Sequence, residues 1–174
     1  MFAQRFINLL VAVAAASTAA AECHDEKPAL YCYNGPDDNP QDLTVEDVTY
    51  IANALRAYGR EIEGGRYLTM TARDAPNCAE WTLFTQGSAV ALAKHVDSSK
   101  DSSVLFEDIA NTIDGGQHRH EVGPALIQCL ADGGSAGVIF NGSDVAYKTD
   151  EYVEKGYTPE GILIKIVTTN PDEL

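Results

Sequence analysis

The first regular pattern along the chain predicts an amphipathic helix that begins at Thr44. Apolar residues then recur at helical spacing and form one stripe, made of Val48, Ile51, Ala52 and Leu55. Thr44 has the side chain of a good N-cap, and Asp47 follows it in a capping-box-like position. We expect the helix to stop near Gly59, because glycine is common where helices end.

A second helix is predicted from Val104 to about Asp114, with Ser102 or Ser103 as its N-cap. Its apolar positions follow helical spacing and would form the buried face: Leu105, Phe106, Ile109, Ala110 and Ile113. The polar residues between them would face solvent. The pair Gly115-Gly116 ends the pattern, as expected at a helix C-terminus.

Several segments have the pattern of strands. Residues 66–72 alternate, residues 79–85 contain the only tryptophan, and residues 88–96 follow after a short turn. The short connections between these three segments predict an antiparallel meander. Residues 136–140 form a short predicted strand, and residues 161–168 are apolar and β-branched, which is typical of a central strand.

Two segments are less regular. Residues 125–130 are apolar and contain Cys129, and both helix and strand fit them. Residues 144–159 are expected to form a long excursion, which carries Tyr147, Tyr152 and Tyr157. The order of helix, strands, helix and strands predicts an α+β fold, an α/β sandwich whose antiparallel sheet has both helices packed on one face.

The start of the chain has the features of a secretory signal peptide. Arg5 is its only charged residue, an apolar run extends from Phe6 to Ala16, and small residues precede Ala21. The run is shorter than the roughly 20 apolar residues that a membrane-spanning helix needs, and no later run is long enough. We therefore expect residues 1–21 to be cleaved, residues 22–174 to form a single secreted α+β domain, and no segment to span a membrane.

The chain is strongly acidic. It has 26 Asp and Glu residues against 12 Lys and Arg residues, a formal net charge of −14, and the acids are spread along the chain. Nucleic acids and anionic membrane surfaces are bound by basic surfaces, so this charge argues against both as partners. A solvated extracellular surface accounts for the acids without a functional acidic patch.

Four cysteines follow the expected cleavage site: Cys23, Cys32, Cys78 and Cys129. An even number in a secreted chain predicts two disulfides, and all three pairings of four cysteines stay open. Structural zinc is the alternative, but no two of the cysteines have the short C-x-x-C spacing that such sites favour. We expect a disulfide-bonded protein with no bound metal and no cofactor.

Candidate catalytic chemistry is confined to histidines. His118 and His120 lie beside Glu121, and this spacing could chelate a metal or supply an acid and a base. An exposed polar loop after a helix explains the same residues without a ligand, and we favour it. His95 with Glu80 and a second histidine could serve a small secreted hydrolase or ribonuclease, but no second basic residue is obviously placed for phosphate. We assign no catalytic residue.

Two short signals concern processing. Asn141-Gly142-Ser143 is an N-glycosylation sequon near a predicted strand end, so we expect a glycan on Asn141. The last three residues of the chain, Asp172-Glu173-Leu174, are shared with ER-retention tetrapeptides. Because Pro171 departs from that pattern, retention is only a minor alternative to secretion.

Four segments carry a resemblance to a known family: Asn77-Cys78-Ala79 opening a strand, Ser103–Ala110, Cys129, and the closing segment Gly161–Val167. Together they resemble the secreted fungal killer-toxin and necrosis-inducing effector family, typified by the killer toxin of smut fungi and related leaf-mould extracellular effectors. The resemblance implies an α/β sandwich and a secreted, disulfide-bonded protein without catalysis. The killer toxins are basic and have more cysteines, so no functional residue is carried over.

We therefore expect an effector-like or toxin-like glycoprotein that binds a protein or cell-surface target of a host or competitor. The alternative is a small secreted hydrolase or ribonuclease that uses His95 or the pair His118/His120, and a third hypothesis is a structural or carrier protein of the secretory route. A pocket with a histidine beside a carboxylate would favour the enzyme. A large exposed apolar patch or an uncovered sheet edge would favour binding.

Overall fold

The computed structural model describes residues 26–76, 78–116 and 124–169. In chain order, the elements are β1 (Tyr31–Cys32), α1 (Val45–Gly59), β2 (Tyr67–Met70), β3 (Glu80–Gln86), β4 (Ala89–His95), β5 (Ser102–Leu105), α2 (Phe106–Asp114), η1 (Leu126–Asp132), β6 (Gly134–Gly137), η2 (Val145–Lys148), α3 (Asp150–Glu154) and β7 (Ile162–Thr168). The predicted signal peptide lies outside the described residues.

Five strands form one antiparallel sheet in the order β1-β6-β7-β4-β3. β7 lies in the middle, which confirms the central strand predicted for residues 161–168. Successive side chains of a strand point to opposite faces of the sheet. Ile162, Ile164 and Ile166 join the main core, whereas Lys165 points to the opposite face and is only partly buried.

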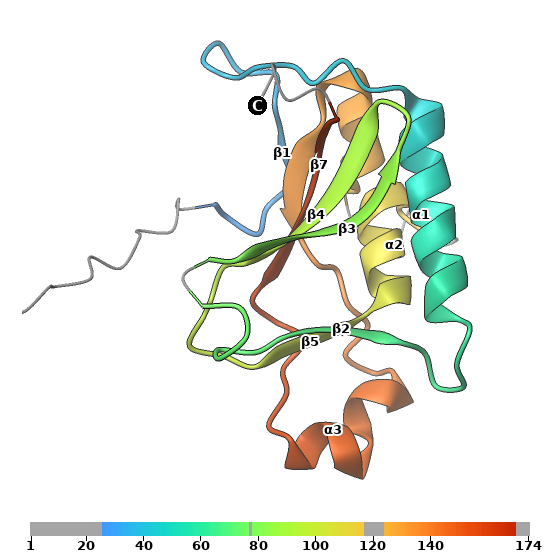
Figure 1. Ribbon diagram of the computed structural model, residues 1–174, viewed down its shortest axis with the longest axis vertical. Coiled ribbons are helices and arrows are strands. Elements are labelled where there is room, and N and C mark those ends of the chain that lie inside the picture. The colour runs from blue at the N-terminus through green and yellow to red at the C-terminus, as the bar shows by residue number, and fades with distance from the viewer. Residues whose placement is uncertain (1–25, 77, 117–123, 170–174) are drawn as a thin grey trace, which may run out of the picture.

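Both long helices cover one face of this sheet, as predicted (Figure 1). The two helices lie side by side and bury Ile51 and Leu55 of α1 against Ile109 and Ile113 of α2. Burying each such side chain contributes roughly 1.5–3 kcal/mol. β4 contributes three small side chains to this core, those of Ala89, Ala91 and Ala93. They leave room for the larger isoleucine and leucine side chains of the helices. The fold class is therefore α+β.

The first helix begins where the sequence predicts. Thr44 is its N-cap, and the Thr44 Oγ1 accepts a 3.3 Å hydrogen bond from the backbone N–H of Asp47. The Asp47 carboxylate in turn accepts hydrogen bonds of 2.8 Å from both the backbone N–H and the hydroxyl of Ser88. Asp47 thus ties the start of α1 to the turn between β3 and β4, which lies 41 residues later in the chain.

The second helix begins later than predicted, at Phe106. Residues Ser102–Leu105 form β5 instead, so neither serine caps the helix. The hydroxyl of Ser103 hydrogen-bonds the hydroxyl of Thr69 at 2.8 Å, across the ladder to β2. The side chain of Ser102 lies 3.1 Å from a ring nitrogen of His95. Both serine side chains thus bond to partners outside the helix, which overrides their local preference for a helix cap.

The predicted three-stranded meander is wrong. β3 and β4 are neighbours, but β2 pairs antiparallel with β5 in a separate two-stranded sheet. Leu68 of β2 lies opposite Val104 of β5. Short connections favour pairing between successive strands, but here the two partners are separated by the whole β3–β4 hairpin. A bulge also interrupts the β3–β4 pairing between Thr82 and Phe84.

The segment for which helix and strand both fitted is the 3-10 helix η1, and a disulfide connects it to the N-terminal arm. Cys129 of η1 is bonded to Cys32 of β1, with their Cα atoms 5.2 Å apart. Cys78 is also disulfide-bonded, and the described residues include no free cysteine. Cys23 lies outside the described residues. Disulfide bonding, predicted from the cysteine count, is thereby confirmed for Cys32, Cys78 and Cys129.

β6 begins at Gly134, two residues before the predicted range 136–140. A Cβ on Gly134 would lie 3.0 Å from the Cys129 sulfur and closer still to the backbone oxygen of Tyr31. Glycine therefore allows β1 and the disulfide to approach the sheet at this point. Within the part of the chain that the structure describes, no helix has the length and apolarity needed to cross a membrane.

Candidate binding groove

The excursion predicted for residues 144–159 folds as η2 and α3 and packs beside the β2–β5 sheet, at the lower end of the view in Figure 1. Its tyrosines form a cluster with Tyr67 of β2. The ring centroids of Tyr67 and Tyr152 are 5.6 Å apart, and those of Tyr147 and Tyr152 are 5.4 Å apart. Tyr157 packs edge-on against Tyr152 at 5.6 Å. The cluster fixes the excursion to the sheet.

The hydroxyls of the buried tyrosines have hydrogen-bond partners. Tyr147 donates to the carboxylate of Asp108 at 2.5 Å and accepts from the backbone N–H of Leu105 at 2.9 Å. Tyr152 donates to the backbone oxygen of Ser103, and Tyr67 donates to that of Ala146, each at 2.7 Å. These bonds link η2 and α3 to α2, β2 and β5. The excursion is therefore held in a defined position.

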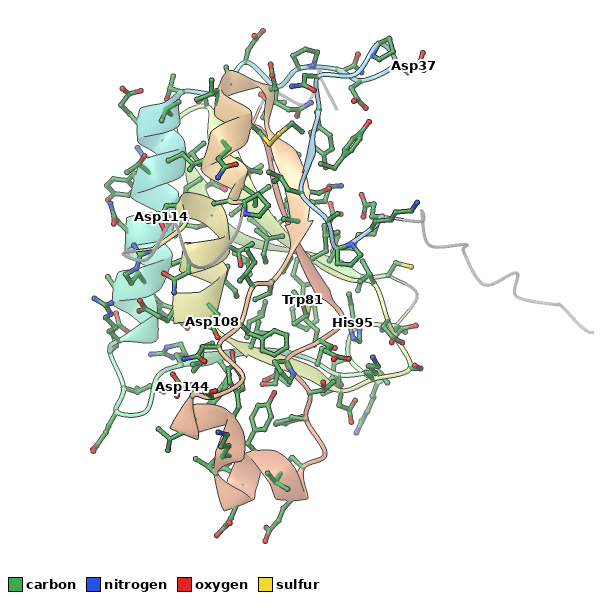
Figure 2. All side chains as sticks on the ribbon, turned by 180° about the vertical axis from the view of Figure 1, so that it is seen from behind. Asp37, Trp81, His95, Asp108, Asp114 and Asp144 are labelled. Atoms are coloured by element: carbon green, nitrogen blue, oxygen red, sulfur yellow. A yellow bond between two sulfur atoms is a disulfide. The ribbon has the colours of Figure 1, made fainter. Side chains whose placement is uncertain are left out.

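Asp108 lies in the first turn of α2, where its carboxylate is buried behind the excursion (Figure 2). Burial raises the pKa of Asp108 above its ordinary value, and the hydrogen bond from Tyr147 partly offsets this effect. Burial also raises the pKa of Tyr147, and the neighbouring Asp108 adds to the rise. The phenol therefore keeps its proton and stays a hydrogen-bond donor to Asp108.

A groove of about 500 Å³ opens between this excursion and the loop that precedes β2. We call it the tyrosine groove. Its lining combines apolar side chains, two loop glycines, small hydroxyls and charged groups: Ile62, Glu63, Gly64, Gly65, Tyr67, Thr69, Ser103, Asp144, Val145, Ala146, Thr149, Glu151, Tyr152, Lys155 and Tyr157. Ile62 is 46% exposed and Val145 is 75% exposed. The groove therefore presents apolar surface directly to solvent.

The charges in the groove are mainly negative. Glu63, Asp144 and Glu151 contribute carboxylates, and Lys155 is the only cation among the described residues that line the groove. Lys155 forms an ion pair of 2.7 Å with Glu151. In the described residues, no Lys, Arg or His side chain lies within ion-pair distance of Glu63 or Asp144. Asp144 instead accepts a 2.9 Å hydrogen bond from the backbone N–H of Ala146, at the start of η2.

His95 is fully buried in the interior of the protein (Figure 2) and does not line the groove. One ring nitrogen is 2.9 Å from the backbone oxygen of Ala75, and the other is 3.1 Å from the hydroxyl of Ser102. Since a carbonyl only accepts, Nδ1 carries the proton and Nε2 accepts from Ser102. Glu80 pairs with Lys94 across the β3–β4 ladder, so its side chain points to the other face of the sheet. His95 and Glu80 therefore do not form a site.

The remaining predicted sites are the histidine pair with Glu121 and the glycosylation sequon at Asn141. His118, His120 and Glu121 lie outside the described residues. Asn141 is exposed, and its side-chain oxygen accepts a 3.1 Å hydrogen bond from the backbone N–H of Ser143. The sequon is therefore accessible at the surface. Among the described residues, no group of three His, Cys, Asp or Glu side chains could hold a metal ion.

A second cavity, of about 570 Å³, lies beside β1 and the N-terminal arm. Charged side chains on the sheet face away from the helices pair with one another next to it. Lys94 lies 2.6 Å from Glu26, and Lys165 lies 3.2 Å from Glu80. Burial acts to lower the pKa of Lys165, but Tyr33 and these two carboxylates outweigh it and raise the pKa above its ordinary value. Lys165 therefore stays charged, and the ion pairs of Lys94 and Lys165 with Glu26 attach the N-terminal arm to the sheet.

A third cavity, of about 440 Å³, lies along the uncovered edge of the sheet at β3. Its lining is largely apolar and includes Trp81, Phe84 and Phe106. The β-bulge after Thr82 lies on the same edge strand. This cavity contains no charged side chain, so its lining says little about the chemistry of a ligand.

No family model, no curated protein and no solved structure matches this chain. What the tyrosine groove could bind therefore has to be inferred from its lining residues. Unlike the cavities beside β1 and β3, the tyrosine groove combines exposed apolar surface with carboxylates, Glu63 and Asp144, that have no cation partner among the described residues.

The sequence locates half of the tyrosine groove. The excursion with Tyr147, Tyr152 and Tyr157 is predicted, but the second wall is not. That wall comes from the loop before β2, which contributes Glu63, and from Tyr67. A Gly-Gly pair between acidic and aromatic residues is the only local signal for this wall, and it reads equally well as a plain turn.

Proposed function

We propose that this chain is a secreted, effector-like protein that acts by binding a target of a host or competitor through the tyrosine groove, without catalysis. Three observations support secretion: the signal-like start of the sequence, the disulfide-bonded cysteines and the strongly acidic composition. Disulfides are typical of proteins that leave the reducing cytosol. Glycosylation at Asn141 belongs to the same proposal.

The groove itself carries the proposal of binding. Ligand sites are typically concave and mainly apolar, with a few polar groups that set orientation. The tyrosine groove has this composition, and the hydrogen bonds of Tyr147 and Tyr152 hold its walls in place. A preformed wall lowers the entropic cost of binding, because the side chains are already ordered.

The described part of the chain offers the enzyme alternative no support. The hydrolase or ribonuclease considered from the sequence uses His95 or the pair His118/His120, and such a histidine must reach the substrate to act as an acid or a base. His95 is buried with both ring nitrogens engaged, and Glu80 points to the other face of the sheet. The enzyme alternative then depends on His118 and His120 alone, and both lie outside the described residues.

A matched pair of exposed valines tests the proposal. Val145 lies in the groove at 75% exposure, and Val153 lies outside its lining at 63% exposure. Val145→Arg should block the groove, while Val153→Arg makes the same chemical change elsewhere. Fluorescently labelled protein is incubated with plant protoplasts and with yeast spheroplasts, and bound fluorescence is measured by flow cytometry.

We expect saturable binding of the wild-type protein to one of the two cell types, displaced by unlabelled wild type. Val145→Arg should compete at least tenfold less well, and Val153→Arg should compete like the wild type. Absence of saturable binding to both cell types would overturn the proposal. Equal competition by the two variants would also overturn it, because the groove would then play no part.

A further inference from the structure

We infer that the tyrosine groove recognises a Lys or Arg side chain presented by an extended peptide segment of its partner, with an aliphatic neighbour of that side chain on the apolar wall. This inference rests on the proposed binding function. It adds the chemical class of the ligand, which that function leaves open. Three features of the groove carry it: an internal cation, carboxylates that have no cation partner among the described residues, and an apolar wall.

The groove already holds one ammonium group of its own chain. The Nζ atom of Lys155 lies 2.7 Å from a carboxylate oxygen of Glu151 and 5.7 Å from the centre of the Tyr157 ring. A carboxylate and a tyrosine face together form a cation site, because both present negative charge to the ammonium. Lys155 is exposed, so it occupies this site at little cost and is readily displaced.

Glu63 and Asp144 extend the negative surface beyond the Lys155 site. Neither has a cation partner among the described residues, and Asp144 is fixed by its bond to the backbone of Ala146. The negative charge of Asp144 and of Glu151 acts on a tyrosine of the groove. The pKa of Tyr67 is raised first by burial and then by the charges of Asp144 and Glu151. A second positive charge would therefore be attracted to this wall even while Lys155 stays in place.

The apolar lining favours a peptide over a free cation. Lysine and arginine lay their aliphatic stems along apolar surface while the charged end reaches a carboxylate. Ile62, Val145 and Tyr157 offer such surface next to the acids. Exposed valine and isoleucine also give a place for an aliphatic neighbour along the peptide. No atom lies within 4 Å of a Cβ built on Gly64, so this end of the groove is open to a chain running through it.

The test uses a synthetic peptide of sequence Gly-Leu-Lys-Leu-Lys-Leu-Gly with blocked ends. A second peptide carries Nε-acetyl-lysine at both lysine positions, which keeps the stem and removes the charge. Binding of each to the cleaved, disulfide-bonded protein is measured by isothermal titration calorimetry at low and at physiological salt. We expect the lysine peptide to bind at least tenfold more tightly than the acetylated peptide, with an affinity that falls as salt rises.

Matched variants locate the interaction. Glu63→Gln combined with Asp144→Asn should weaken binding of the lysine peptide at least fivefold, since asparagine keeps the N-cap of η2. Asp37→Asn with Glu154→Gln removes the same number of negative charges outside the groove and should leave binding within twofold of wild type. Lys155→Met should tighten binding about two- to fivefold because the internal competitor is gone, whereas Lys27→Met should not.

The failures of the two proposals are distinguishable. Equal binding of the lysine and acetylated peptides, or equal loss in the groove and control variants, would overturn the inference. If n-butylammonium displaces the lysine peptide at the peptide's own concentration, a small amine is the occupant and the peptide is rejected as ligand. If Val145→Arg loses cell binding while the lysine peptide does not bind, the inference fails and the proposed function stands.

Discussion

The phenol of Tyr147 donates a 2.5 Å hydrogen bond to the carboxylate of Asp108, which lies 39 residues earlier in the chain. Both side chains are buried, and the same phenol oxygen accepts from the backbone N–H of Leu105. One hydroxyl thus satisfies a buried carboxylate and a buried amide at once. It joins α2, β5 and the excursion that forms one wall of the tyrosine groove.

Tyr147→Phe should therefore lower the free energy of unfolding by about 1–3 kcal/mol, the usual cost of leaving buried polar groups without partners. Tyr31→Phe is the matched control, because Tyr31 also donates to an aspartate, Asp38, at 2.7 Å but is 51% exposed. The control should change stability by no more than about 0.5 kcal/mol. Urea denaturation followed by circular dichroism measures both, and equal effects would show that burial does not matter here.

Asp47 should give the fold a measurable dependence on acid pH. The backbone N–H of Ser88, followed by the hydroxyls of Thr44 and Ser88, lowers the pKa of Asp47 below its ordinary 3.8. The unfolded chain thus takes up the proton at a higher pH than the folded chain. The stability that Asp47 contributes is present above pH 3.8 and is lost as the pH falls through its folded pKa.

Asp47→Asn removes this titration. The melting temperature of the variant should lie below that of the wild type at pH 7, and the gap should narrow between about pH 5 and about pH 2. Asp37→Asn, on an exposed loop, serves as the control and should follow the wild-type curve. A constant gap between Asp47→Asn and wild type over this range would contradict the role of the Asp47 carboxylate.

The Cys32–Cys129 disulfide should be a major source of stability. It joins residues separated by 97 positions, and closing so long a loop restricts the unfolded chain strongly. Replacing both cysteines with alanine should cost about 2–5 kcal/mol in urea denaturation. Reducing the double variant then isolates the contribution of the disulfide that contains Cys78. A double variant as stable as the wild type would contradict this expectation.

Asn141 should carry a glycan when the chain is made in a secretory host. Its side chain is exposed, and the turn around Ser143 leaves the sequon at the surface. Treatment with peptide-N-glycosidase F should reduce the apparent mass by one glycan, and Asn141→Gln should remove the shift. Secreted protein of unmodified mass would show that the sequon is not used.

Much of the fold follows from local pattern. The stripe from Val48 to Leu55 predicts α1, and the β-branched run that ends at Thr168 predicts the central strand. Both signals are local, because each depends only on the spacing of apolar residues within one element. The placement of both helices on one face follows from the order of the elements.

The segment around Val104 shows where local pattern is insufficient. Ser102 and Ser103 followed by apolar residues fit a capped helix as well as a strand. The choice is made by Leu68, which lies opposite Val104 in a ladder that the order of the strands does not predict. The tyrosine groove is hidden for the same reason, since Tyr67 lies beside Tyr152 on a strand whose partner, β5, the order of the strands does not predict.

The shape of the sheet's two edges has a consequence for how this protein behaves at high concentration. Open strand edges recruit further strands from other molecules, and natural proteins counter this with short edge strands and bulges. Here β1 is only two residues long, and the bulge after Thr82 disrupts the other edge. Both edges are thus poor templates for strand addition. The chain is therefore expected to resist aggregation through its strand edges when it is concentrated.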